Sequence, residues 1–562
     1  MRTQFFNRAW LVLLVFVGFS IQRTLAQDPF PSMSLRMACS NGVNTVYWTD
    51  SLMYGSVFLQ MSPSLSPAAT WTNLATDDPV LSFDSNLTFG GHAALVTNYV
   101  GYETALSLPP IGQQQFFRLS AMNSIPASSF AIFYFGTLEF SDCAPMVING
   151  RVHAIGPIDV GTIASSSLRF NASVTTSSTI SAPDLNGATT GDWDPSIPST
   201  WNTTFNGNPG SITNYINYHF GYGFPVANPF NAHSLIDFPT ITQTGPYYAN
   251  IWTNAQMLYN QAQMVLVVTN SPFGTNPAVW LTLQSSYAGM VPGADVIPMV
   301  LYYTNTTPGF LSTNLPFLSL TNWTYDHRES KTNLFTQIDV GLFSTWVSTN
   351  PIVQGKLPAA AGLYPTILYV ADRRNHGSYK LPSVRLVNGA QLPANNGLGF
   401  SVATPNPLYV QGNYNIQNTN GSATGTNNAY EVPAALFSDA LTILSPNWTD
   451  QKGYAAYSSA SSTFYATTTT INAAIVTGTM PSTGGTTTTY SGGVHNLPRL
   501  LENWTGFNLY LNTSIIRLWT SQMATNQWQY QGTYYNPPNR YFMFDQNFLN
   551  PAKVPPGIPL LY

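Results

Sequence analysis

The sequence predicts a mainly β protein in which a small N-terminal β-sandwich domain precedes an irregular, interrupted parallel β-helix with a few short helices. Three observations predict this class. Hydrophobic residues make up 44% of the chain and aromatic residues 14%, enough to build a large core. Thr, Val, Ile and Tyr, which favour strands, recur in short runs, and 41 Gly and 41 Pro supply turns. Only 7% of residues are charged, against roughly a quarter in most soluble proteins.

The first 26 residues have the pattern of an export signal. Arg2 and Arg8 form a basic start, and the apolar run 9–19 is shorter than the about 20 residues of a membrane-spanning helix. The small residues of Thr24-Leu25-Ala26 provide a cleavage site, although an uncleaved anchor is the alternative. We therefore expect a secreted or envelope protein that begins after Ala26 and has no transmembrane span after cleavage.

The charge balance argues against a nucleic-acid partner. Of the 19 basic residues, Arg2, Arg8 and Arg23 lie in the signal, which leaves 16 against 23 acidic residues. Nucleic-acid phosphates require a basic surface, which this chain lacks. The partners that remain open are a surface glycan or an envelope protein, and no cofactor is expected.

Residues 33–121 are predicted to form the β-sandwich-like domain. The runs 43–48 and 56–61 have strand composition and are separated by turn residues at sandwich-like spacing. Together with the segments 70–73 (TWTN) and 115–119 (QFFRL), this layout resembles the fibronectin-like or immunoglobulin-like modules of secreted bacterial proteins. Such modules act as spacers or binders.

Two cysteines, Cys39 and Cys143, remain in the mature chain. In an oxidising compartment they could form a disulfide between the first domain and the chain that follows it. Two separate buried thiols are the alternative.

Residues 146–562 are predicted to form the β-helix, with a large insertion at about 185–320. Very short strand-like runs alternate with Gly, Asn and Ser, as in the coils of a β-helix, and antiparallel hairpins are the alternative. One helix is predicted over 433–445, where Pro433 can open it and apolar residues recur every three or four positions until Ser445-Pro446.

Several segments resemble a group of uncharacterised secreted or envelope proteins of Verrucomicrobia-like bacteria that have PilX-like or bactofilin-like β-helical segments. The segments that carry the resemblance are 146–153, 325–331, 337–341, 400–414, 491–496 and 535–540. The resemblance implies a pilus-assembly-like or other surface component, and it implies no catalytic residues.

The best polar cluster for catalysis comprises Asp326 and Glu329, with Asp339 downstream. Paired carboxylates can perform acid–base chemistry on a glycan, and the same residues can form a structural ion-pair network with Arg328. Near Asp372 we expect a turn with an Asp–Arg contact. The sequence has no recognisable metal site, nucleophile elbow or phosphate loop.

Aromatic residues crowd the C-terminal region. Trp528, Tyr530, Tyr534 and Tyr535 are candidates for stacking on sugar rings, or they cap the open end of a β-helix. Together these features favour a non-enzymatic structural or adhesive protein. A glycan-acting hydrolase or lyase on a β-helix and a carbohydrate-binding protein are the alternatives.

Overall fold

The computed structural model describes most of the chain after residue 124 and the strands before it. The longer described ranges are 125–143, 146–162, 257–270, 315–356, 365–393, 397–482, 497–528 and 534–561. Shorter described segments are 168–170, 174–176, 180–181, 203–205, 208–209, 232–239, 277–283, 299–303, 491 and 493–494. The predicted signal, residues 1–26, lies outside the described residues.

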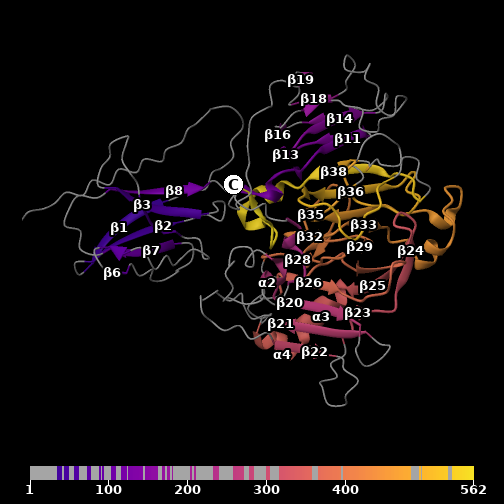
Figure 1. The fold of residues 1–562 in the computed structure, drawn as a ribbon, viewed down its shortest axis with the longest axis horizontal. Helices are drawn as coiled ribbons and strands as arrows, with labels where there is room; N and C mark the ends of the chain where they lie inside the picture. Colours follow the sequence, from indigo (N-terminus) through magenta and orange to yellow (C-terminus); the bar gives the residue numbers. More distant parts are fainter. Residues whose placement is uncertain are drawn as a thin grey trace, which may run out of the picture. The chain divides into compact units, whose positions relative to one another are not determined.

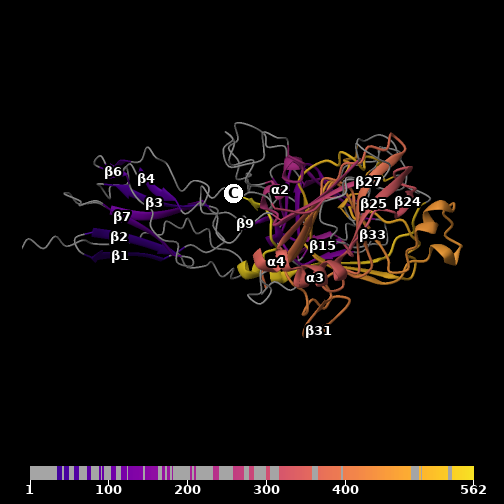
Figure 2. The ribbon, with the colours of Figure 1, turned by 90° about the horizontal axis from the view of Figure 1, so that it is seen from below.

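The chain divides into two compact units, one of 1–126 with 221–224 and 560–562, the other of 127–220 and 225–559. The first unit contains two three-stranded antiparallel sheets, ordered β1-β2-β7 and β4-β3-β8 (Figures 1 and 2). Their strands are β1 (Ser34–Ser40), β2 (Val43–Thr49), β3 (Ser56–Ser62), β4 (Thr72–Thr76), β7 (Glu103–Leu108) and β8 (Phe116–Met122). Three short strands accompany them: β5 (Thr88–Phe89), β6 (His92–Ala93) and β9 (Ile125–Pro126), which pairs with β39 (Leu560–Leu561).

The second unit is organised around an 11-stranded sheet. In spatial order its strands are β16 (Val174–Thr176), β13 (Val152–Ile155), β10 (Ile132–Phe135), β37 (Ile515–Arg517), β35 (Ala474–Thr477), β32 (Ala434–Ser438), β28 (Phe400–Ala403), β26 (Ile367–Asp372), β20 (Met264–Thr269), β21 (Ala278–Leu283) and β22 (Met299–Tyr303). From β16 to β20 all neighbours are parallel, whereas β21 and β22 are added antiparallel at one edge.

Further sheets flank the large one. One is ordered β23 (Leu318–Ser319), β25 (Lys331–Asp339), β27 (Lys380–Val387), β29 (Leu408–Gln411) and β33 (Leu441–Leu444), with β24 (Trp323–Asp326) also paired to β25. Another consists of β34 (Thr469–Asn472), β36 (Asn508–Thr513) and β38 (Asn539–Phe544). Two smaller sheets come from the N-terminal part of this unit. One consists of β11 (Leu138–Cys143), β14 (Ile158–Thr162) and β17 (Ile180–Ser181), and the other of β12 (Met146–Ile148), β15 (Leu168–Phe170), β18 (Thr203–Phe205) and β19 (Asn208–Pro209).

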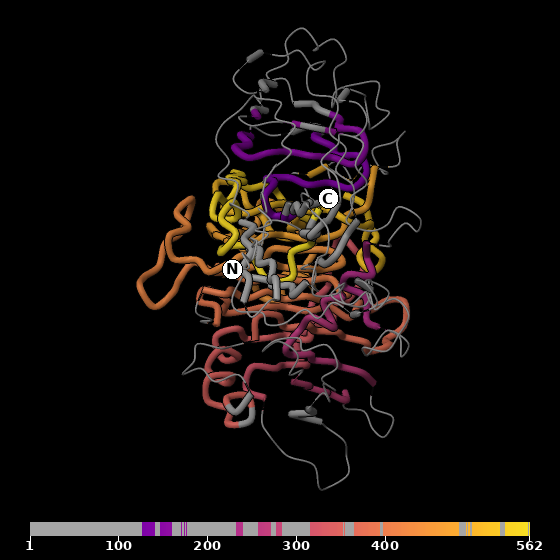
Figure 3. Tube along the Cα trace, turned by 90° about the vertical axis from the view of Figure 1, so that its left-hand side faces the viewer, coloured from indigo at the N-terminus to yellow at the C-terminus, as the bar shows by residue number. Residues whose placement is uncertain are grey.

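The spatial order of the strands in the large sheet differs from their order in the chain. The chain enters the large sheet at β10, which is not an edge strand, and adds β13 and then β16 toward one edge. It re-enters at the opposite end with β20 and returns through β26, β28, β32 and β35, until β37 pairs with β10. Figures 1 and 3 show the purple strands of the second unit lying beyond the yellow C-terminal ones. Ser514 Oγ reinforces this junction by donating to the carbonyl of Phe130, 384 residues away, at 2.5 Å.

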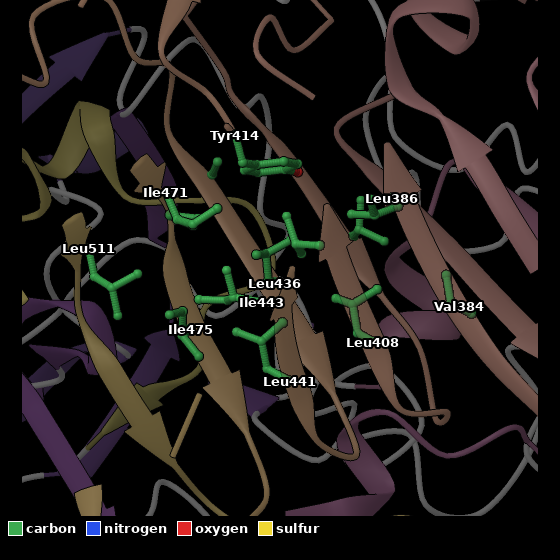
Figure 4. Packing of buried hydrophobic residues seen from close by; sticks show 14 of the residues in the cluster. Val384, Leu386, Leu408, Tyr414, Leu436, Leu441, Ile443, Ile471, Ile475 and Leu511 are labelled. Carbon is green, nitrogen blue, oxygen red and sulfur yellow. The ribbon is translucent and has the colours of Figure 1, made fainter. Parts of the chain in front are cut away.

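The core lies between the sheets, where inward side chains stack in register (Figure 4). One ladder runs without interruption through the parallel strands and across the β37–β10 junction. In spatial order its members are Met264, Leu368, Val402, Leu436, Ile475, Ile515, Ile132, Val152 and Val174, all buried. Burial of each such side chain contributes about 1.5–3 kcal/mol before the entropy cost of ordering it.

Three buried asparagines from separate parts of the chain bond to one another. Asn512 Nδ2 donates to Asn472 Oδ1 at 2.7 Å, and Asn472 Nδ2 donates to the carbonyl of Asn415 at 3.0 Å. Asn415 has a left-handed φ of 57°, which asparagine tolerates better than most residues. These bonds satisfy buried polar groups where the chain turns between sheets.

The mainly β class is confirmed, but the helix predicted over 433–445 is wrong. The segment forms β32 and β33, with Asp439 and Ala440 turning between them. Both strands are buried along their whole length, so their sequence lacks the polar alternation that identifies a half-exposed strand. The short helices lie elsewhere: α2 (Leu258–Gln261), α3 (Val340–Thr349) and α4 (Pro351–Lys356).

The region predicted as an insertion contributes strands to the large sheet, since β20, β21 and β22 all fall within 185–320. Within the described ranges, no helix has both the length and the apolar character needed to cross a membrane.

Candidate functional site

The predicted acidic cluster forms the turn between β24 and β25. Asp326 is 1% exposed, and its Oδ1 accepts the backbone N–H groups of Arg328 and Glu329 at 2.8 and 3.0 Å. Its Oδ2 accepts the hydroxyl of Tyr409 at 2.6 Å. Burial and the charge of Asp326 raise the pKa of Tyr409 well above its usual value, so that hydroxyl stays protonated and donates. Both oxygens of Asp326 are therefore used to hold the turn.

Glu329 ties the same turn to the C-terminal part of the chain. Its Oε1 accepts from Arg499, and its Oε2 accepts the N–H of Asn526 at 3.2 Å. Arg328 and Asn526 exchange two further bonds, at 3.3 and 3.0 Å. Burial and the positive charge of nearby Arg499 lower the pKa of Arg328, and the negative charge of Glu329 partly opposes that shift.

Asp339 does not join this cluster. It ends β25, whereas Asp326 pairs with Lys331 at the start of that strand, so strand geometry separates the two acids by about 26 Å. Asp339 caps α3 by accepting the N–H of Leu342 at 2.9 Å, and it accepts Asn388 Nδ2 at 2.6 Å. Glycosidases place their paired carboxyls roughly 5–10 Å apart. The three acids consequently do not form a paired-acid site.

The aromatic tail packs into the body of the second unit. Tyr534 is buried, while Trp528 and Tyr535 are half-buried. Burial raises the pKa of Tyr535, and hydrogen bonds with Trp528 and Arg540 partly oppose that shift. Tyr530 lies outside the described residues. These positions do not present a row of exposed rings.

The cysteine side chains also lie outside the described parts of the structure. Cys39 falls in β1 of the first unit, and Cys143 is the last residue of β11 in the second. Their pairing stays a prediction.

Two further ion pairs are buried in the second unit. Asp372 binds Arg374 at 2.5 Å, which confirms the predicted Asp–Arg contact. Glu502 accepts Lys452 Nζ at 2.9 Å and the Ser445 hydroxyl at 2.9 Å. A serine beside a lysine can act as a nucleophile and base, but Ser445 and Glu502 are both 0% exposed, so no substrate can reach them.

His233 attaches the short 3-10 helix Ala232–Leu235 to the turn after β32. Its ring nitrogens lie 2.6 Å from Asp237 Oδ1 and 3.4 Å from Asp439 Oδ1. Asp439 also accepts the N–H groups of Met523 and Ala524 at 3.1 and 2.9 Å. Burial alone would lower the pKa of His233, but the hydrogen bonds and charges of the two aspartates raise it to about 9.

This raised pKa predicts a pH-dependent contribution of His233 to stability. A group whose folded pKa exceeds its unfolded value stabilises fully below the unfolded value, here 6.5, and loses that effect as pH rises through about 9. The difference in melting temperature between wild type and His233→Ala should be largest at pH 6 and should shrink by pH 10. An equal difference at both pH values would contradict the assignment.

One acidic pair escaped the sequence prediction. Glu431, ahead of β32, and Asp545, directly after β38, are brought together by Asn428 and Asn547. Asn428 Nδ2 donates to Asp545 Oδ1 at 2.7 Å, and Asn547 Nδ2 donates to Glu431 Oε1 at 2.7 Å. Asn428 and Asp545 lie 117 residues apart, and no local motif connects them.

An exposed aromatic pair lies between β24 and the 3-10 helix Asp450–Tyr454. Trp323 is 50% exposed and Tyr454 is 47% exposed; their ring centroids lie 4.6 Å apart, edge to face. The Tyr454 hydroxyl donates to the carbonyl of Trp323 at 3.0 Å, which fixes the pair. Tyr325 continues the same face of the strand, because buried Thr324 and Asp326 alternate with it.

Across the described segments, no group of three or more His, Cys, Asp or Glu side chains converges as a metal cluster would. Comparison with known proteins gave no match to any family model, curated protein or solved structure.

Proposed function

We propose that this chain is a secreted or cell-envelope protein with a structural or adhesive role, built on a parallel β-helix behind a β-sandwich-like domain. The register of β10, β13 and β16 supports the β-helix, since Ile132 pairs with Val152 and Val152 with Val174. Between these pairs the chain passes through one strand of each flanking sheet, β11 and β12, then β14 and β15. Such a stack offers long, rigid faces for contact with other molecules.

The single observation that carries the non-enzymatic role is how the acids of the 326–329 turn are used. Asp326 and Glu329 are buried, and each carboxylate oxygen accepts a hydrogen bond from the frame. A general acid or base must reach a substrate atom directly or through one water. These two carboxylates instead hold the turn and bind it to Tyr409, Arg499 and Asn526.

The test uses the full chain expressed with its N-terminal segment. We expect the exported protein to begin at Gln27 and to release no reducing sugar from any polysaccharide of a panel. Retention of residues 1–26 in an exported product would contradict cleavage after Ala26. Sugar release by the purified protein would contradict the non-enzymatic role.

The Trp323–Tyr454 pair favours carbohydrate binding as a second candidate function. Aromatic rings that stay exposed at the surface provide apolar area for the faces of sugar rings, and few such residues carry most of the binding energy in an interface. We expect the protein to bind oligosaccharides on a glycan array, and Trp323→Ala and Tyr454→Ala to weaken that binding by about tenfold or more.

Tyr541→Ala is the matched control, because Tyr541 is 41% exposed and belongs to an aromatic pair with Tyr510 in a different sheet, on β38 and β36. We expect it to bind like wild type. Equal loss of binding in all three variants, or in none, would exclude the Trp323–Tyr454 pair as the binding surface.

A further inference from the structure

The Glu431–Asp545 pair has buried carboxyl oxygens to which no neighbouring group donates a hydrogen bond. One oxygen of each carboxyl group is bonded, since Asn547 holds Glu431 Oε1 and Asn428 holds Asp545 Oδ1. The second oxygens, Glu431 Oε2 and Asp545 Oδ2, are buried, and no N–H or O–H group of another described residue donates to either. Asp545 is 1% exposed, so water does not compensate for the missing partner.

The two carboxyl groups also repel each other when ionised. A hydrogen bond joins the two side chains when one carboxyl carries a proton, so the two groups lie in direct contact. Two ionised carboxylates in contact need a positive charge between them. The pair therefore requires either a shared proton or a cation.

The atoms around the pair suit a hard cation. Calcium is bound by carboxylate and amide oxygens in flexible geometry, and asparagine supplies such an oxygen when its amide group rotates by half a turn. Asn428 and Asn547 already contact the two carboxyls through their amide groups. Two carboxylates and two amide oxygens would surround one ion, and its two positive charges would balance both acids.

Backbone hydrogen bonds near Glu431 and Asp545 hold these groups in place. Asp545 caps the 3-10 helix Gln546–Leu549 by accepting the N–H of Asn547 at 2.9 Å, so both residues belong to one rigid turn after β38. Glu431 lies two residues before Pro433, whose carbonyl accepts the N–H of Phe400 in β28. A cation here would join the segment before β32 to the end of β38.

We propose that Glu431 and Asp545, with Asn428 and Asn547, form a binding site for one calcium ion. The site goes beyond the proposed structural or adhesive role and does not depend on it. A proton shared between the carboxyls is the competing explanation, and it predicts a response to pH but none to calcium.

The test titrates CaCl2 into chelator-treated full-length protein at pH 7.5 and follows both the heat of binding and the melting temperature. We expect one calcium per chain and a rise in melting temperature with calcium. Glu431→Gln keeps the shape and removes a charge. It should melt higher than wild type without calcium and should lose the calcium response, and Asp545→Asn should lose it too.

Asp339→Asn is the matched control, because Asp339 also caps a helix and accepts an asparagine amide, Asn388 Nδ2. We expect it to keep the full calcium response. Absence of binding to folded wild type at millimolar calcium would overturn the proposal. A calcium response that persists in both Glu431→Gln and Asp545→Asn would overturn it equally.

Discussion

Replacement of Glu329 by alanine is expected to lower the free energy of unfolding by about 3–5 kcal/mol. The substitution leaves Arg499 buried without its carboxylate, next to the buried guanidinium of Arg328. It also removes the acceptor of the Asn526 N–H group. The frame cannot readily relax around two uncompensated charges, since the turn is bonded to segments almost 200 residues away in the chain. Urea denaturation of the purified variant measures the loss.

Asp339→Asn again serves as the control for this variant. Asparagine caps helices about as well as aspartate, and this position is less buried, so its unfolding free energy should change by less than about 1 kcal/mol. A similarly small change for Glu329→Ala would show that the 326–329 turn does not stabilise the frame.

Replacement of Gly399 by alanine is expected to produce the second largest loss, more than about 3 kcal/mol. Gly399 has a φ of 86°, and an added Cβ would lie 2.1 Å from the carbonyl oxygen of Pro433. That oxygen accepts the N–H of Phe400 at 2.8 Å, where β28 pairs with β32. The methyl group would force these two strands apart.

Gly397→Ala separates the steric effect from the backbone effect. Gly397 has nearly the same φ, 81°, but nothing lies within 4 Å of an added Cβ. It should cost only the about 1–2 kcal/mol of a left-handed alanine. Equal losses in the two variants, measured by urea denaturation, would contradict the close contact between Gly399 and Pro433.

The mainly β character was predictable because it depends on local composition. Short runs of β-branched and aromatic residues, separated by Gly, Asn and Pro, form strands in many different contexts. The segment 433–445 misled the prediction because a strand buried on both faces and a buried helix share the same apolar composition. The register of β32 places Leu436 between Val402 of β28 and Ile475 of β35, and both of these partners lie far from Leu436 in the sequence.

The order of the strands in the large sheet could not be predicted from the sequence. The pairing of Ile132 with Ile515 joins the two ends of the second unit, and no local pattern marks either residue as a partner of the other. The candidate site has the same limitation. The sequence identified Asp326 and Glu329 because they are adjacent in a chain poor in charge, but Glu431 and Asp545 meet only through folding.

Asp326→Ala offers the most direct test of the claim that the 326–329 turn is framework rather than active site. The substitution leaves the N–H groups of Arg328 and Glu329 and the hydroxyl of Tyr409 without their acceptor. Melting and sugar release are measured on one preparation of wild type and variant. We predict a lower melting temperature for the variant and no sugar release by either protein. Unchanged melting, combined with sugar release by wild type that the variant loses, would contradict the account.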